Sequence, residues 1–126
     1  VPGEWSHYQL SVTWQAEAEA LVVICHLDLP YIEEHQEAVI QVSAMLNQEL
    51  WLGHFVYDQS NDRLSLRHTL PLRGAGGATA EQIEDLVDII LGESKLAYPV
   101  LYQVAVGELA AADAVGLTLV AHQGEA

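Results

Sequence analysis

A glycine-rich loop, running from Arg73 to Ala78 directly before a predicted helix, holds the residues best placed to bind an anion. Backbone N–H groups and the dipole at a helix N-terminus favour a phosphate, and an arginine beside them would add positive charge. The pattern is neither a P-loop, which needs a lysine before the Ser or Thr, nor a dinucleotide fingerprint. Two interpretations stay open: a plain strand-to-helix connection, or an anion or nucleotide site made by Arg73, Gly74, Gly76, Gly77 and Thr79.

Histidines are the next candidates, because imidazole can ligate a metal or move a proton. Four of the six histidines fall on four different predicted strands, and no pair has the helical spacing of a His-Glu-x-x-His motif. His26 and Asp28 lie on one face of one strand and form a minimal pair of candidate metal ligands. A structural zinc site needs a closed set of four ligands, so we expect no metal and no cofactor.

Nucleophilic catalysis has little support in this sequence. Cys25 ends the aliphatic run Leu21-Val22-Val23-Ile24, where burial would raise its pKa and make the thiol inert. No Gly-x-Ser-x-Gly elbow occurs, and the paired carboxylates belong to solvated faces of predicted helices. We therefore expect no catalytic residues and a protein that is not an enzyme. The alternative that stays open is an uncharacterised metal-dependent enzyme.

Composition bounds the class of protein. The chain has 126 residues, of which 51% are hydrophobic, which suits a single domain over residues 1–126. Its net charge of −14 would repel nucleic acid and anionic membrane surfaces. No apolar stretch is long enough to span a membrane, and the first residues, Val1 to Glu4, resemble no signal peptide. We expect a cytoplasmic protein whose natural start lies upstream.

Strand patterns occur in two pairs. Period-two alternation predicts strands, and turn-forming residues separate the members of each pair, at 5–14, 20–28, 52–58 and 63–70. Within the first strand, Tyr8, Leu10, Val12 and Trp14 share one face. The second strand is apolar on both faces, which is typical of a central strand or of one covered on both sides.

Helical periodicity follows each pair of strands. The first helix is predicted over 33–49, with Val39, Val42, Leu46 and Leu50 as its apolar stripe, widened by Ile40 and Met45. A capping box of Thr79 and Gln82 begins the second helix, which Pro99 should kink or restart. A short helix is expected within 108–120. Hairpins alternating with helices predict an α+β fold, an antiparallel sheet of β-β-α-β-β-α order with helices on one face.

In their order and spacing, several segments resemble the YbjN family, and the likeness is nearest to its alphaproteobacterial branch. They are Trp51-Leu52-Gly53-His54-Phe55, the strand 63–70, Arg73-Gly74, the helix start at 82–87, Tyr98-Pro99 and the end Gly124-Glu125-Ala126. The resemblance implies a fold like that of type III secretion chaperones, which are small acidic proteins that often dimerise and bind other polypeptides. It also implies a helix before the first strand that this sequence lacks, and a sensory transduction or stress-related regulator without an established catalytic set.

These observations predict a non-enzymatic bacterial protein-binding module, chaperone-like or regulatory. Its partner would be another polypeptide, and a homodimer is expected. The alternatives are a small-ligand sensor that uses the glycine-rich loop and the metal-dependent enzyme.

Overall fold

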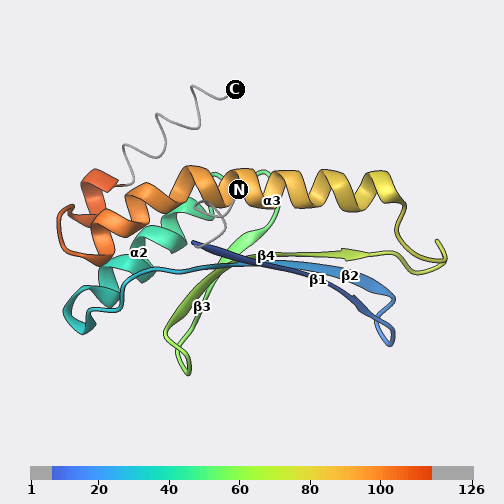
Figure 1. Ribbon diagram of the computed structural model, residues 1–126, viewed down its shortest axis with the longest axis horizontal. Coiled ribbons are helices and arrows are strands. Elements are labelled where there is room, and N and C mark those ends of the chain that lie inside the picture. Colours follow the sequence, from blue (N-terminus) through green and yellow to red (C-terminus); the bar gives the residue numbers. More distant parts are fainter. Residues whose placement is uncertain (1–6, 115–126) are drawn as a thin grey trace.

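Four antiparallel strands form one sheet, and the long helices lie on the same side of it (Figure 1). The computed structural model describes residues 7–114. Along the chain the elements are β1 (Tyr8–Gln15), β2 (Ala20–Leu27), the 3-10 helix η1 (Glu33–His35), α2 (Gln36–Leu46), β3 (His54–Asp58), β4 (Arg63–Pro71) and α3 (Ala80–Ala105). This order, with the helices packed against the sheet, confirms the predicted α+β fold.

Within the sheet the strands are ordered β1-β2-β4-β3, so β2 and β4 are central and β1 and β3 are the edges. The register pairs Cys25 with Leu10 of β1 on one side and with Leu66 of β4 on the other. Since side chains alternate between faces, this register fixes two sets of residues. Facing the helices are Tyr8, Leu10, Val12, Trp14, Leu21, Val23, Cys25, Leu27, Phe55, Tyr57, Leu64, Leu66, His68 and Leu70.

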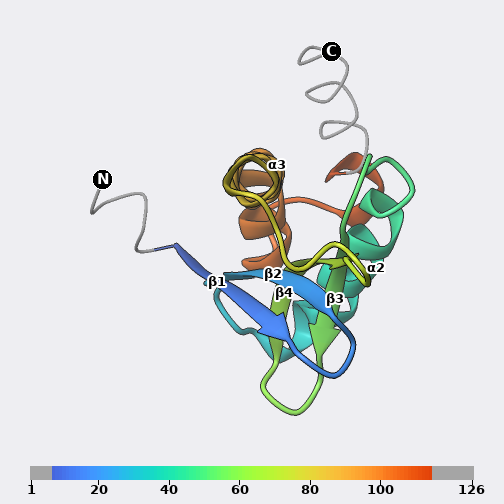
Figure 2. The ribbon, with the colours of Figure 1, turned by 90° about the vertical axis from the view of Figure 1, so that its right-hand side faces the viewer.

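The opposite side of the sheet, here called the bare face, carries no helix among residues 7–114 (Figures 1 and 2). Its side chains come from alternate positions of all four strands: Gln9, Ser11, Thr13, Gln15, Ala20, Val22, Ile24, His26, His54, Val56, Asp58, Arg63, Ser65, Arg67, Thr69 and Pro71. The central position predicted for β2 is therefore confirmed. Ala20 and Val22 are nevertheless buried on this face, where residues of the two neighbouring strands flank them.

The core lies between the sheet and the helices. α2 buries Val39, Val42 and Leu46, as its stripe predicts, whereas Met45 is 46% exposed and does not widen that stripe. From α3 the core receives Leu86, Ile90, Ser94, Ala97, Tyr98, Leu101, Val104 and Ala105. Cys25 is fully buried, as expected, and burial raises the pKa of its thiol.

Element boundaries differ from the predictions by a few residues. The helix predicted over 33–49 begins as η1 and ends at Leu46, and the strand predicted from 52 begins at His54. Gly53 has a positive φ of 80°, a backbone conformation that breaks a strand, and this accounts for the late start of β3. Helical backbone returns at 111–114 inside the predicted 108–120 segment. Residues 108–110 of that segment are not helical, and its positions 115–120 lie outside the described residues, as do positions 5 and 6 of the first predicted strand.

The capping box predicted for α3 is confirmed. Gln82 N–H donates to Thr79 Oγ1 over 3.0 Å, and Thr79 N–H donates to Gln82 Oε1 over 2.8 Å. Of the two outcomes predicted at Pro99, a kink or a restart, the restart does not occur, since α3 runs without interruption to Ala105. Pro99 is exposed, so the backbone hydrogen bond that it cannot make lies on the solvent side, where water can replace it.

Candidate functional site

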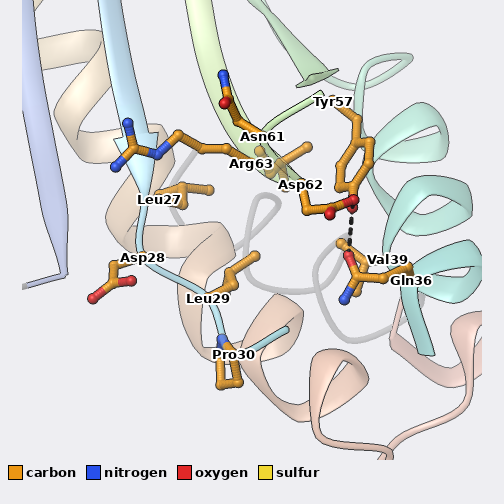
Figure 3. Close-up of a pocket in the computed structure, with 11 residues that line it drawn as sticks. Leu27, Asp28, Leu29, Pro30, Gln36, Val39, Tyr57, Asn61, Asp62 and Arg63 are labelled. Carbon is orange, nitrogen blue, oxygen red and sulfur yellow. Dashed lines mark hydrogen bonds between the residues drawn. The ribbon is translucent and has the colours of Figure 1, made fainter. Parts of the chain in front are cut away.

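Beyond the end of β2, a hollow of about 210 Å³ lies among the following loop, the start of α2 and the β3–β4 hairpin (Figure 3). Its polar groups converge from segments far apart in sequence, which include Asp28, Gln36, Tyr57, Asp62 and Arg63. Leu27, Leu29 and Val39 are among its apolar lining. Ligand sites usually enclose about 300–1,000 Å³, so this hollow suits a small group or one side chain of a partner.

Among the side chains of this hollow, Tyr57 has the most strongly shifted pKa. Its hydroxyl lies 2.7 Å from Gln36 Oε1 and 3.0 Å from Asp62 Oδ1, and its single proton can be donated to one of them at a time (Figure 3). Desolvation, followed by the hydrogen bond and the negative charge of Asp62, raises the pKa of Tyr57 to about 12. At neutral pH this phenol is a hydrogen-bond donor rather than a base.

Both candidate metal ligands, His26 and Asp28, line a second hollow of about 300 Å³, together with Tyr8, Gln9, Leu27 and Arg63. His26 Nδ1 is hydrogen-bonded to Ser65 Oγ on the adjacent strand. Desolvation and then the charge of Arg63 lower the pKa of His26, and the same guanidinium would repel a metal ion here. Within residues 7–114, no group of three or more His, Cys, Asp or Glu side chains could hold a metal.

The glycine-rich loop extends away from the rest of the described structure. Gly74, Gly76 and Gly77 have positive φ angles, and a Cβ placed on any of them would meet nothing within 4 Å. The hydroxyl and N–H of Thr79 are both used by the capping box. Arg73 is exposed at the start of the loop. The loop residues proposed as an anion site are therefore neighbours along the chain, and no other described element encloses the three glycines.

Tyr98 of α3, which was not among the predicted site residues, connects this helix to the sheet. Tyr98 donates a hydrogen bond of 2.9 Å to the carbonyl oxygen of Asp28, and its hydroxyl oxygen lies 3.1 Å from His7 Nδ1. Its ring is also 5.6 Å, between centroids, from that of Tyr8. The signal was present in the sequence, because Tyr98 follows Ser94 by four residues and precedes Leu101 by three, which are helical spacings.

The two edges of the sheet differ. At β3, Asn47 closes the edge with its side-chain amide, which donates to Phe55 O over 3.2 Å and accepts from Phe55 N–H over 2.6 Å. At β1, no strand within residues 7–114 pairs with the outer edge. Val12 and Trp14, on the helix-facing side of β1, remain 41% and 42% exposed. β1 thus combines an outer edge that no described strand covers with the exposed apolar side chains of Val12 and Trp14.

A further apolar hollow, of about 470 Å³, lies where Trp51 stands beside α3. Ile89, Gly92 and Leu96 contribute to its lining, and Trp51 itself is 83% exposed. Large exposed aromatic side chains are enriched at protein interfaces. This hollow is the second exposed apolar surface described here, and it lies on α3 rather than at the edge of the sheet.

Comparison with known proteins gives one match. The family model YbjN, described as "Putative bacterial sensory transduction regulator", matches residues 1–103. No curated protein and no solved structure shows significant similarity to this chain. None of the helices in residues 7–114 is long and apolar enough to cross a membrane.

Proposed function

The chain belongs to the YbjN family, and on that premise we propose that it is a non-enzymatic protein-binding module, chaperone-like or regulatory, that takes a strand of another polypeptide at the outer edge of β1. The observation that carries this proposal is the contrast between the two edges of the sheet. The side chain of Asn47 hydrogen-bonds the outer edge of β3 at Phe55, whereas no strand of the described residues pairs with the outer edge of β1, beside Val12 and Trp14. Natural proteins usually protect such an edge or use it.

Strand addition would use two features of β1. Main-chain hydrogen bonds along the edge supply affinity, and alternate side chains of the added strand contact the exposed apolar residues. No residue of the segment Tyr8–Gln15 carries a charge, although the chain as a whole has a net charge of −14. An incoming strand, whether from a different protein or from a second copy in a homodimer, therefore meets little repulsion at this edge.

The test uses a matched pair of tryptophan substitutions. Tagged wild-type protein, Trp14→Ala and Trp51→Ala are incubated with extract of the source cells, and the retained proteins and small molecules are identified and quantified by mass spectrometry. Light scattering on each purified protein reports self-association. We expect a stoichiometric polypeptide partner, or a homodimer, that Trp14→Ala weakens by about tenfold and Trp51→Ala leaves intact, as befits an interface hot spot. Urea unfolding confirms that both variants fold.

Other outcomes assign the function elsewhere. Partner loss in Trp51→Ala alone would move the binding surface to α3 and contradict the β1 proposal. A retained small molecule without a protein would favour the ligand sensor, and Arg73→Gln should then release that molecule. Stoichiometric metal in protein purified without a histidine tag would favour the enzyme.

A further inference from the structure

Charge is unevenly distributed between the two sides of the sheet. The chain has 18 acidic and 4 basic residues, yet the strands of the bare face carry one carboxylate, that of Asp58, and two guanidinium groups, those of Arg63 and Arg67. A second carboxylate, that of Asp28, follows β2 and shares a hollow with His26 and Arg63. Two imidazoles, of His26 and His54, lie on the same face. Half of the basic residues thus lie on a surface that no helix covers among residues 7–114. Solubility alone gives no reason for cations to gather on one face of an acidic protein.

The carboxylate of Asp58 is hydrogen-bonded within its own hairpin. Asp58 Oδ1 accepts hydrogen bonds from Ser60 N–H (3.0 Å) and Ser60 Oγ–H (2.7 Å), and Oδ2 accepts one from Asn61 Nδ2 (2.7 Å). Although Asp58 is the cross-strand neighbour of Arg63, no ion pair joins them. Within residues 7–114, neither Arg63 nor Arg67 forms an ion pair with a carboxylate, although Asp28 and Asp62 line the same hollow as Arg63.

Apolar surface lies between the arginines. A hollow of about 140 Å³ on the bare face is lined by Ile24, His26, Val56, Asp58, Ser65 and Arg67. Val56 is 37% exposed, and Ile24 is half-buried. Arg63 lines the adjoining hollow that also contains His26. Along β4, the two arginines are four positions apart, which is about 13 Å at about 3.3 Å per residue.

From this arrangement we propose that the bare face binds an acidic polypeptide segment, with carboxylates about 13 Å apart on Arg63 and Arg67. A small apolar side chain of the segment would lie between them at Val56, which is opposite Ser65, midway between the two arginines. Guanidinium groups form bidentate hydrogen bonds with carboxylates, which makes an acidic side chain the matching partner. The proposal does not depend on β1, because the two surfaces present different side chains.

Net negative charge opposes this binding at long range only. The Debye length is about 8 Å at physiological ionic strength, and packed layers of a protein lie about 10 Å apart. Carboxylates of α2 and α3 are therefore largely screened from a ligand on the far side of the sheet. At low ionic strength that screening is lost, so affinity should fall rather than rise when salt is removed.

Nucleic acid would also meet arginines here, but the described strands place no Phe, Tyr or Trp side chain on this face. Proteins that bind single strands on a sheet stack bases on aromatic side chains. The aromatic residues of the strands, Tyr8, Trp14, Phe55 and Tyr57, all face the helices. The observations therefore favour an acidic polypeptide over RNA.

The test measures binding of a fluorescein-labelled peptide of about 12 residues by fluorescence anisotropy at about 0.15 M salt. The peptide has two glutamates four positions apart with a valine midway between them, in a background of serine and threonine. A peptide with both glutamates replaced by glutamine, and a uridine homopolymer of equal length, serve as comparison probes. The proteins are wild type, R67Q, R63Q/R67Q, R67K and W14A, with R73Q as the matched control, since it removes the same charge from the glycine-rich loop.

We expect the glutamate peptide to bind and the glutamine peptide to bind at least tenfold more weakly, since about a tenfold loss accompanies each charge-assisted hydrogen bond removed. R63Q/R67Q should lose binding, R67K should fall between wild type and R67Q, and R73Q and W14A should match wild type. If R67Q fails to fold, R67K carries the same comparison. No binding to wild type, equal losses in R73Q and R67Q, or tighter binding of the uridine homopolymer would overturn the proposal. If W14A binds the glutamate peptide as tightly as wild type does, the two surfaces act independently, and failure of either proposal leaves the other standing.

Discussion

At the scale of single residues, His35 and Gly107 lie in close contact and hold the start of α2 against the end of α3. His35 Nδ1–H donates to Ala105 O over 3.0 Å, and a Cβ on Gly107 would lie 2.4 Å from His35 Cε1. We expect Gly107→Ala to lower the free energy of unfolding by about 2–3 kcal/mol, because it combines a positive φ with a steric clash.

Urea denaturation measures this change, and Gly76→Ala provides its control. Gly76 also has a positive φ, 77°, but a Cβ there meets nothing within 4 Å. It should cost only about 1 kcal/mol, the strain of the backbone alone. Equal decreases in the free energy of unfolding for the two variants would show that the His35 side chain moves aside at little cost. The contact would then not hold the two helices together.

His68 makes stability depend on pH. It lies half-buried on the helix-facing side of β4, where desolvation, followed by the charge of His54, lowers its pKa below the usual 6.5. The unfolded chain therefore binds more protons between the two pKa values, so stability is complete above pH 6.5 and falls as the pH drops below it. His68→Leu should flatten this dependence in urea titrations at neutral and mildly acidic pH, with the remainder due to other groups such as His26. An unchanged slope would contradict the assignment.

At the scale of elements, the capping box should be a measurable part of the stability of α3. Thr79→Ala removes one acceptor for the first N–H groups of the helix and should cost about 1 kcal/mol in urea unfolding. Thr79→Ser keeps the acceptor and should restore most of that loss. Comparable losses in both variants would mean that the methyl group of Thr79, and not its hydroxyl, stabilises this end.

The elements themselves were predictable because their signals are local. Period-two alternation placed Tyr8, Leu10, Val12 and Trp14 on one face, and the cap fixed the start of α3 within a residue. Strand order was not predictable, because the pairing of β2 with β4 joins segments about 40 residues apart and depends on burial in the whole fold. Met45 was misassigned for the same reason: its spacing fits the stripe of α2, but no other element covers it.

At the scale of the whole molecule, the net charge of −14 predicts a response to salt. Like charges repel more in the compact state than in the expanded chain. Raising the ionic strength from about 0.01 M to about 0.15 M shortens the Debye length from about 30 Å to about 8 Å. We expect the urea midpoint to rise over this range, and a fall would show that favourable ion pairs outweigh the repulsion.

Candidate sites were harder to predict than the fold. His26 and Asp28 could be paired from sequence because they are two residues apart on one strand, but Arg63 enters their hollow only through the β2–β4 register. The cationic bare face depends on the same register. Arg63 and Arg67 read as ordinary polar positions of an alternating strand until the structure shows that no helix covers that side within residues 7–114.

The strand order also has a consequence for synthesis of the protein. The β1–β2 and β3–β4 hairpins can each close within microseconds of emerging, whereas the central β2–β4 ladder waits for Arg63–Pro71 to be made. At ribosomal speeds of about 5–20 residues per second, the apolar β2 stays without its complete second neighbour for about 2–9 s. During that interval the nascent chain exposes the apolar side chains of β2 and an unfilled strand edge, which makes this stage of synthesis prone to aggregation.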